Sequence, residues 1–143
     1  MNTGRPPVTA ALGRVVYGAM YLVGGMIHLF LWWDDPNVYA EITPYILFDW
    51  YRVLWTGHVL PNLEVLLPVL AGFELLVGGL VLNQGRRTRL GHGIGAAFQV
   101  ALAPLGFWWP ANVVLAAGHV LLSRHQFRVA SIADLRRRLR GSA

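Results

Sequence analysis

Four apolar stretches separated by polar segments dominate the chain. The first runs from Val8 or Arg14 to Trp33, the second from Pro61 to Leu82, and the third and fourth share residues 90–123. As a helix rising about 1.5 Å per residue, the second stretch covers roughly 30 Å, the thickness of a hydrocarbon core. The pattern predicts an all-α membrane protein, a four-transmembrane-helix bundle with two short spans. A half-inserted hairpin over residues 90–123 is the alternative.

The segments between and after these stretches carry their own patterns. Residues 83–89 (NQGRRTR) and 106–112 (GFWWPAN) are expected to be turns. Residues 34–60 are longer, and their aromatic-rich part, YILFDWYRVLW at 45–55, predicts a helix lying in the membrane interface. We therefore expect a transmembrane domain over residues 1–125, followed by a basic cytoplasmic tail over residues 126–143.

The tail contains SIADLRRRLR, in which Ile132, Leu135 and Leu139 share one helical face. Such a basic amphipathic helix is typical of binding to an anionic membrane surface, and a solvated tail is the alternative. The arginines that lie largely away from the apolar face are Arg136, Arg137, Arg138 and Arg140.

Composition supports a lipid-facing protein. Only 13% of the residues are charged, 55% are hydrophobic and the mean hydropathy is +0.47, whereas soluble domains carry about a quarter charged residues. There is no cysteine, which excludes disulfides, thiol catalysis and thiolate metal sites. The basic residues are all arginines at the ends of apolar stretches, so no nucleic-acid partner is expected.

The arginines also predict the orientation. Eleven of the twelve lie in the N-terminal region, the 83–89 turn or the C-terminal region, and only Arg52 belongs to the opposite side. The positive-inside rule therefore predicts that both termini are cytoplasmic. The first stretch is expected to remain as an anchor, because no cleavage site follows it.

An ionisable group within the hydrocarbon region costs on the order of 3 kcal/mol and needs a partner. Glu74 lies at about the depth of Gln99, with Tyr17 and Tyr21 near the same level. The structural interpretation is a Glu74–Gln99 or Glu74–Tyr21 hydrogen bond that holds helices together. The functional interpretation is a proton-carrying or ligand-binding carboxyl group.

Near the opposite membrane face, His28, His58 and Glu64 are expected at similar depth. A His–Glu pair there could relay protons or hold a quinone head group, and the three side chains are also a candidate zinc or iron site. Interfacial histidines wetted by water are the simpler interpretation. Pairing His28 with His58 and His92 with His119 would instead supply axial ligands for haem.

Glycine pairs along the stretches predict close helix packing. They are Gly24–Gly25, Gly78–Gly79 and the G-x-x-x-G spacing of Gly91 and Gly95. No strand is expected before them, so they are not phosphate-binding loops.

One segment carries a family resemblance. FELLVGGLVLNQGRRTRLG at 73–91, after the earlier GGMIHLFLWW at 24–33, resembles the DoxX-like family of small four-helix bacterial membrane proteins. The resemblance implies a four-helix bundle in the cytoplasmic (inner) membrane, associated with redox or sulfur metabolism. Some relatives are subunits of a thiosulfate:quinone oxidoreductase.

These patterns together predict an accessory or quinone-binding subunit of a membrane redox complex. Its partners would be the lipid bilayer and other subunits, with homo-oligomers a further option. The alternatives are a haem b-carrying electron-transfer subunit and a small proton-coupled transporter. An independent enzyme is not expected, because no nucleophile and base with an orienting third group appear.

Overall fold

The computed structural model describes residues 6–140, apart from the side chains of residues 135 and 138–140, and confirms an all-α fold. The longer helices are α1 (Val8–Asp34), α3 (Leu63–Leu82), α4 (Arg86–Leu102), α5 (Trp109–Ser123) and α6 (Ser131–Arg140). The shorter ones are η1 (Pro36–Tyr45), α2 (Asp49–Leu54), the π-helix η2 (Trp55–Val59), η3 (Leu60–Asn62) and η4 (Ala103–Leu105). No strand occurs between residues 6 and 140.

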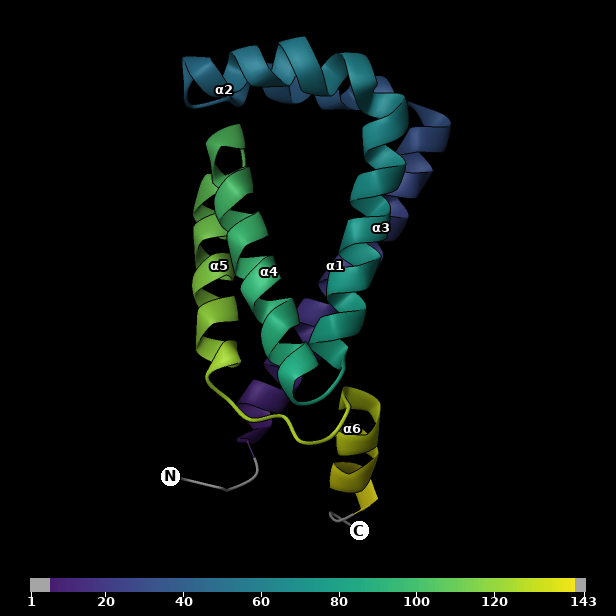
Figure 1. The fold of residues 1–143 in the computed structure, drawn as a ribbon, viewed down its shortest axis with the longest axis vertical. Helices are drawn as coiled ribbons and strands as arrows, with labels where there is room; N and C mark the ends of the chain where they lie inside the picture. The colour runs from purple at the N-terminus through teal and green to yellow at the C-terminus, as the bar shows by residue number, and fades with distance from the viewer. Residues whose placement is uncertain (1–5, 141–143) are drawn as a thin grey trace.

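The long helices form two pairs. α1 runs beside α3, and α4 runs beside α5 (Figure 1). The pairs converge at the end that holds the α3–α4 turn and α6, called the inner end below, and diverge toward the other, outer end, where α2 lies across them (Figure 1). The first residues of α1 also lie at the inner end, so the arginine-rich segments come together there.

The connection over residues 34–62 is largely helical, and the helix predicted over residues 45–55 is found in part as α2. It begins with a side-chain cap, in which the Asn37 backbone N–H donates to Asp35 Oδ1 at 2.9 Å. Two bonds attach the connection to the outer end of the α4–α5 pair: Leu47 N–H donates to the Pro104 carbonyl at 3.0 Å, and the Tyr51 hydroxyl donates to the Ala101 carbonyl at 2.9 Å. The connection therefore bridges both helix pairs.

The predicted turns are displaced. α4 begins at Arg86, four residues before the expected Leu90, so Gly85 at φ 61° makes the turn. Only glycine adopts this conformation without strain. α5 begins at Trp109, inside the segment expected to be a turn, because Pro110 is tolerated in a first helical turn.

Glycines permit the close helix contacts. A Cβ at Gly25 would lie 2.9 Å from the Ala71 carbonyl oxygen, and one at Gly78 would lie 3.0 Å from the Gly18 carbonyl oxygen. A Cβ at Gly91 would lie 2.7 Å from the Val81 nitrogen, across the α3–α4 contact. These contacts confirm the packing role predicted for the glycine pairs, except at Gly79, where a Cβ would meet no atom within 4 Å.

Large apolar side chains point away from the bundle on every long helix of the two pairs. Val16 of α1, Val69 of α3, Val100 of α4 and Val114 of α5 are each more than 60% exposed. Among the described residues, two helical stretches are long and apolar enough to cross a membrane: Val8–Asp34 and the continuous Asp49–Leu82. α5 is apolar but shorter.

The predicted C-terminal helix is present as α6. Its side chains of Arg136 and Arg137 are exposed, whereas those of Arg138 and Arg140 lie outside the described residues. The segment before α6 packs against the bundle, because Phe127 is buried against Ala10 and Leu122 and its carbonyl accepts from Gly85 N–H at 2.7 Å.

Candidate ligand-binding site

Three polar side chains from three elements form a chain in the outer half of the bundle. Glu74 of α3 is only 7% exposed, and its Oε2 lies 3.5 Å from Nε2 of His28 on α1. The other ring nitrogen of His28, Nδ1, shares a hydrogen bond with the Tyr39 hydroxyl of η1. The imidazole thus bridges a carboxyl group and a phenol.

Gly24 makes room for this contact. It lies one helical turn before His28 on α1, and a Cβ there would lie 2.5 Å from Glu74 Oε2. The carboxyl group of Glu74 therefore occupies the space beside Gly24. This arrangement explains why the acid contacts α1.

Tyr39 keeps its proton at neutral pH. Burial, and secondarily the nearby Glu74 carboxylate, raise the pKa of Tyr39 to about 12. Its hydroxyl can therefore donate a hydrogen bond throughout the physiological range. The Tyr39 hydroxyl donates to His28 Nδ1 in one imidazole tautomer and accepts from it in the other. The hydrogen bond between Tyr39 and His28 therefore has two possible directions.

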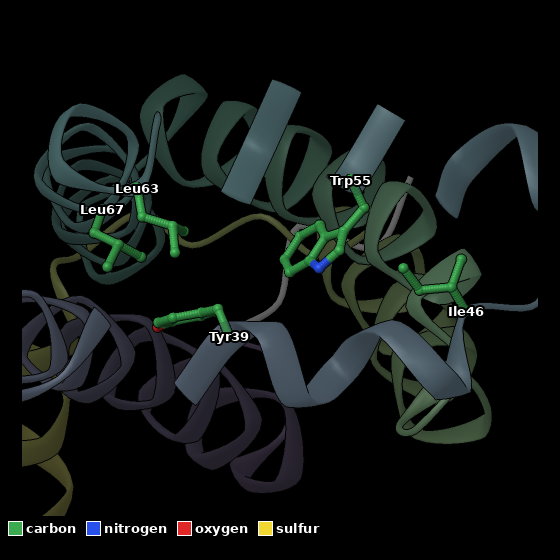
Figure 2. Close-up of a cluster of buried hydrophobic side chains, with 5 residues drawn as sticks. All are labelled: Tyr39, Ile46, Trp55, Leu63 and Leu67. Atoms are coloured by element: carbon green, nitrogen blue, oxygen red, sulfur yellow. The ribbon is translucent and has the colours of Figure 1, made fainter. Parts of the chain in front are cut away.

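An apolar pocket of ≈ 410 Å³ adjoins the Glu74–His28–Tyr39 chain of side chains. It lies between α3 and α4 beneath the 34–62 connection, and four aromatic side chains contribute to its wall: Tyr39, Trp55, Phe73 and Phe98. Leu63 and Leu67 complete the side near the connection, and Figure 2 shows the Trp55 indole projecting between Tyr39 and Ile46. The volume is in the range of small-molecule sites.

Tyr39 connects the pocket to the polar chain. Its ring forms part of the pocket wall, while its hydroxyl contacts His28 outside the pocket. A ligand in the pocket would thus contact an aromatic ring whose hydroxyl is hydrogen-bonded to the partly buried His28.

Glu74 does not use the expected partners. The Gln99 side-chain amide donates to the Tyr21 hydroxyl at 3.1 Å, and that hydroxyl donates to the Gly95 carbonyl at 3.2 Å. Gln99 and Tyr21 therefore join α4 to α1 without the acid. The predicted Glu74–Gln99 and Glu74–Tyr21 bonds are replaced by the Glu74–His28 contact.

The predicted cluster of His28, His58 and Glu64 does not form. His58 and Glu64 are exposed, whereas both ring nitrogens of His28 are engaged by Tyr39 and Glu74. His58 lies in the π-helix η2, whose altered turn shifts side-chain direction. The part of the chain that the structure describes contains no group of three or more His, Asp or Glu side chains able to hold a metal.

His92 and His119 do meet, as their predicted depths allow. Both are fully buried, and their Nδ1 atoms lie 2.9 Å apart in a direct hydrogen bond. Metal–imidazole bonds are about 2 Å long, so an ion between these atoms would hold them roughly 4 Å apart. The geometry is that of a hydrogen-bonded pair, with the Tyr17 ring edge-on to His119 at 4.5 Å.

Two important residues were not identified from the sequence. Arg14 entered only as a positive charge, yet it is 1% exposed and its Nη1 donates to the carbonyls of Asn83 and Val129, both at 3.0 Å. Its guanidinium also lies 4.4 Å from the centre of the Phe127 ring. Tyr39 carried no signal, because it lies in an irregular connection without periodicity.

Comparisons with known proteins give no match to a family model, a curated protein or a solved structure. The DoxX-like resemblance therefore stays a prediction.

Proposed function

We propose that this chain is a four-span protein of a bacterial cytoplasmic membrane that binds a small apolar ligand with a planar ring, of the quinone class. The observation that carries the proposal is the aromatic pocket whose wall includes Tyr39, the end of the partly buried Glu74–His28–Tyr39 chain.

Membrane placement is supported by the outward-facing apolar side chains of α1, α3, α4 and α5. A water-soluble protein rarely exposes apolar patches of this extent. α4 and α5 are short, at roughly 26 Å and 22 Å for about 1.5 Å per residue, and we propose that local bilayer thinning accommodates them. With the arginine-rich end cytoplasmic, α6 would lie on the anionic inner surface.

The ligand class follows from the pocket chemistry. Aromatic side chains on several sides favour a flat ring, which packs in offset or edge-to-face geometry. The gap between α3 and α4 that holds the pocket lies among lipid-facing side chains in this placement, so a membrane-dissolved ligand would reach it laterally. Contact with the Tyr39 ring would place the ligand beside a phenol that is hydrogen-bonded to His28.

We further propose an accessory role within a membrane redox complex. The resemblance of residues 73–91 to DoxX-like proteins supports this context. The haem alternative is less well supported, since His92 and His119 contact each other directly and His58 is exposed.

The binding test uses two matched valines of α3. Val65 and Val69 are 65% and 61% exposed, but only Val69 lines the pocket. Val69→Trp should fill the pocket and reduce the affinity for a short-chain ubiquinone analogue at least tenfold, measured by calorimetry on the full chain in neutral detergent. Val65→Trp should bind like wild type. Equal affinities for the two variants, or no binding by wild type, would refute the pocket assignment.

The placement test uses the absence of native cysteine. With Asn37→Cys and Gln84→Cys as single labelling sites, a membrane-impermeant maleimide should label intact cells only at position 37. Label at position 84 before permeabilisation would contradict the proposed orientation.

A further inference from the structure

A second hollow lies on α4 at the inner end of the bundle, separate from the aromatic pocket. It has a volume of ≈ 470 Å³ and is lined by Arg86, Arg89, Leu90, Gly93, Ile94 and Ala97. Its charged part is the first turn of α4, and its apolar part extends along the same helix. From Leu90 to Ala97 the apolar wall is roughly 10 Å long at about 1.5 Å per residue.

The two arginines are available to a ligand. Both side chains are exposed, and neither guanidinium has a hydrogen-bond or ion-pair partner within the described part of the chain. Arg86 and Arg89 lie three residues apart, and side chains at that spacing are neighbours on a helix surface. Two adjacent guanidiniums match the geometry of a phosphate group, which arginine binds through paired N–H donors.

Gly93 creates the hollow. A Cβ at this position would meet no atom within 4 Å, so close helix packing does not require a glycine here. Glycine in a helix interior costs about 1 kcal/mol relative to alanine. The missing side chain instead leaves an open groove lined by Leu90, Ile94 and Ala97.

We propose that this hollow binds one anionic phospholipid from the inner leaflet. The phosphate and anionic head group would contact Arg86 and Arg89, and an acyl chain would follow the groove past Gly93. In the proposed placement the two arginines lie at the membrane boundary and the apolar groove extends toward the membrane centre. A phospholipid has the same order, with a charged head group at the boundary and acyl chains toward the centre. The inference rests on the proposed membrane placement, but it does not depend on the aromatic pocket.

The test is native mass spectrometry of the full chain released from neutral detergent. Dioleoyl-phosphatidylglycerol or dioleoyl-phosphatidylcholine is added at increasing concentration. Wild type should retain one phosphatidylglycerol at least fivefold more tightly than phosphatidylcholine. Arg86→Gln with Arg89→Gln should weaken phosphatidylglycerol binding about 30-fold, since each arginine near a membrane surface contributes about fivefold.

Two controls separate this site from general surface charge and from helix effects. Arg124→Gln with Arg128→Gln removes the same charge from exposed arginines outside the hollow and should leave the affinity within twofold. Gly93→Leu should weaken both lipids by filling the groove, whereas Gly79→Leu, also in open space but on α3, should not.

Three results would overturn the proposal: equal affinity of wild type for the two lipids, equal losses in both double arginine variants, or full displacement of the lipid by inorganic phosphate at the same concentration. Failure of quinone binding with intact lipid selectivity would reject the aromatic pocket alone. Residence of the chain outside the membrane would reject the placement on which both proposals depend.

Discussion

The α1–α3 contact can be tested by adding one methyl group at two glycines with opposite expected results. A Cβ at Gly25 of α1 would lie 2.9 Å from the Ala71 carbonyl oxygen of α3, which is backbone and cannot rotate away. A Cβ at Gly79 of α3 would meet no atom within 4 Å. Gly25→Ala and Gly79→Ala therefore differ in what the added methyl group contacts.

The magnitude follows from two effects. Replacing glycine by alanine in a helix interior stabilises by about 1 kcal/mol, and both variants gain this. Overpacking a close contact destabilises the fold by about 1–3 kcal/mol, and this effect applies only to Gly25→Ala. Gly79→Ala should raise the free energy of unfolding by about 1 kcal/mol. The two variants should differ by about 1–3 kcal/mol, because the propensity gain cancels in the comparison.

The assay is reversible unfolding of the purified chain in mixed micelles, with increasing mole fraction of a denaturing detergent and helicity as the signal. Gly78→Ala serves as a second close-contact variant, since its Cβ would lie 3.0 Å from the Gly18 carbonyl oxygen. If Gly25→Ala and Gly79→Ala shift the transition equally, the close crossing of α1 and α3 is wrong.

Three further changes test other contacts. Tyr21→Phe should lower the free energy of unfolding by roughly 1 kcal/mol, because it removes the hydrogen bonds to Gln99 and to the Gly95 carbonyl. The double variant Tyr21→Phe with Gln99→Leu should lose less stability than the two single variants added together. Additive losses would argue against the Tyr21–Gln99 hydrogen bond. Alkaline titration followed by near-ultraviolet absorbance should show tyrosine ionisation at about pH 12, and the amplitude of this step should fall by one tyrosine in Tyr39→Phe. An unchanged amplitude would refute the raised pKa of Tyr39. Because this pKa is raised above the ordinary value of about 10, the buried phenol stabilises the fold fully below pH 10, and this stabilisation is lost as the pH rises to 12. Arg14→Gln should loosen the segment before α6, because it weakens the contacts of residue 14 with the Val129 carbonyl and with Phe127. Tryptic cleavage at Arg128 should then be about tenfold faster than in wild type. An unchanged cleavage rate would show that Arg14 does not hold the segment.

The sequence predicted the helices better than their contacts. Hydropathy and arginine positions placed the long helices within a few residues, because apolar length and charged ends are local properties. The glycine pairs likewise pointed to real close contacts at Gly25, Gly78 and Gly91. Gly79 and Gly93 show the limit, since a glycine that permits packing and one that leaves a hollow look the same in a sequence.

The partner of a side chain depends on which neighbouring helix the side chain faces. The position of a residue along its helix does not reveal this direction. Glu74 and Gln99 were expected at similar depth, yet the acid contacts His28 because Gly24 leaves space on α1. His58 was expected to join His28, but the π-helix of residues 55–59 leaves its side chain exposed. Tyr39 lies in a connection with no regular period, so its contact with His28 could be found only in three dimensions.

The aromatic pocket itself follows from a change in residue size along the α3–α4 contact. At the inner end, Gly91 lets α4 approach the backbone of α3 at Val81. About two turns farther along α4, the contact is between two aromatic rings, Phe98 and Phe73, with centroids 5.0 Å apart. A glycine contact at one end and a phenylalanine pair beyond it force the two helices to diverge, as Figure 1 shows. Because the 34–62 connection is hydrogen-bonded to the outer end of α4 through Tyr51, the diverging helices are covered at that end. The pocket is therefore a consequence of two diverging helices beneath a fixed cover, with Phe73 and Phe98 both in its wall.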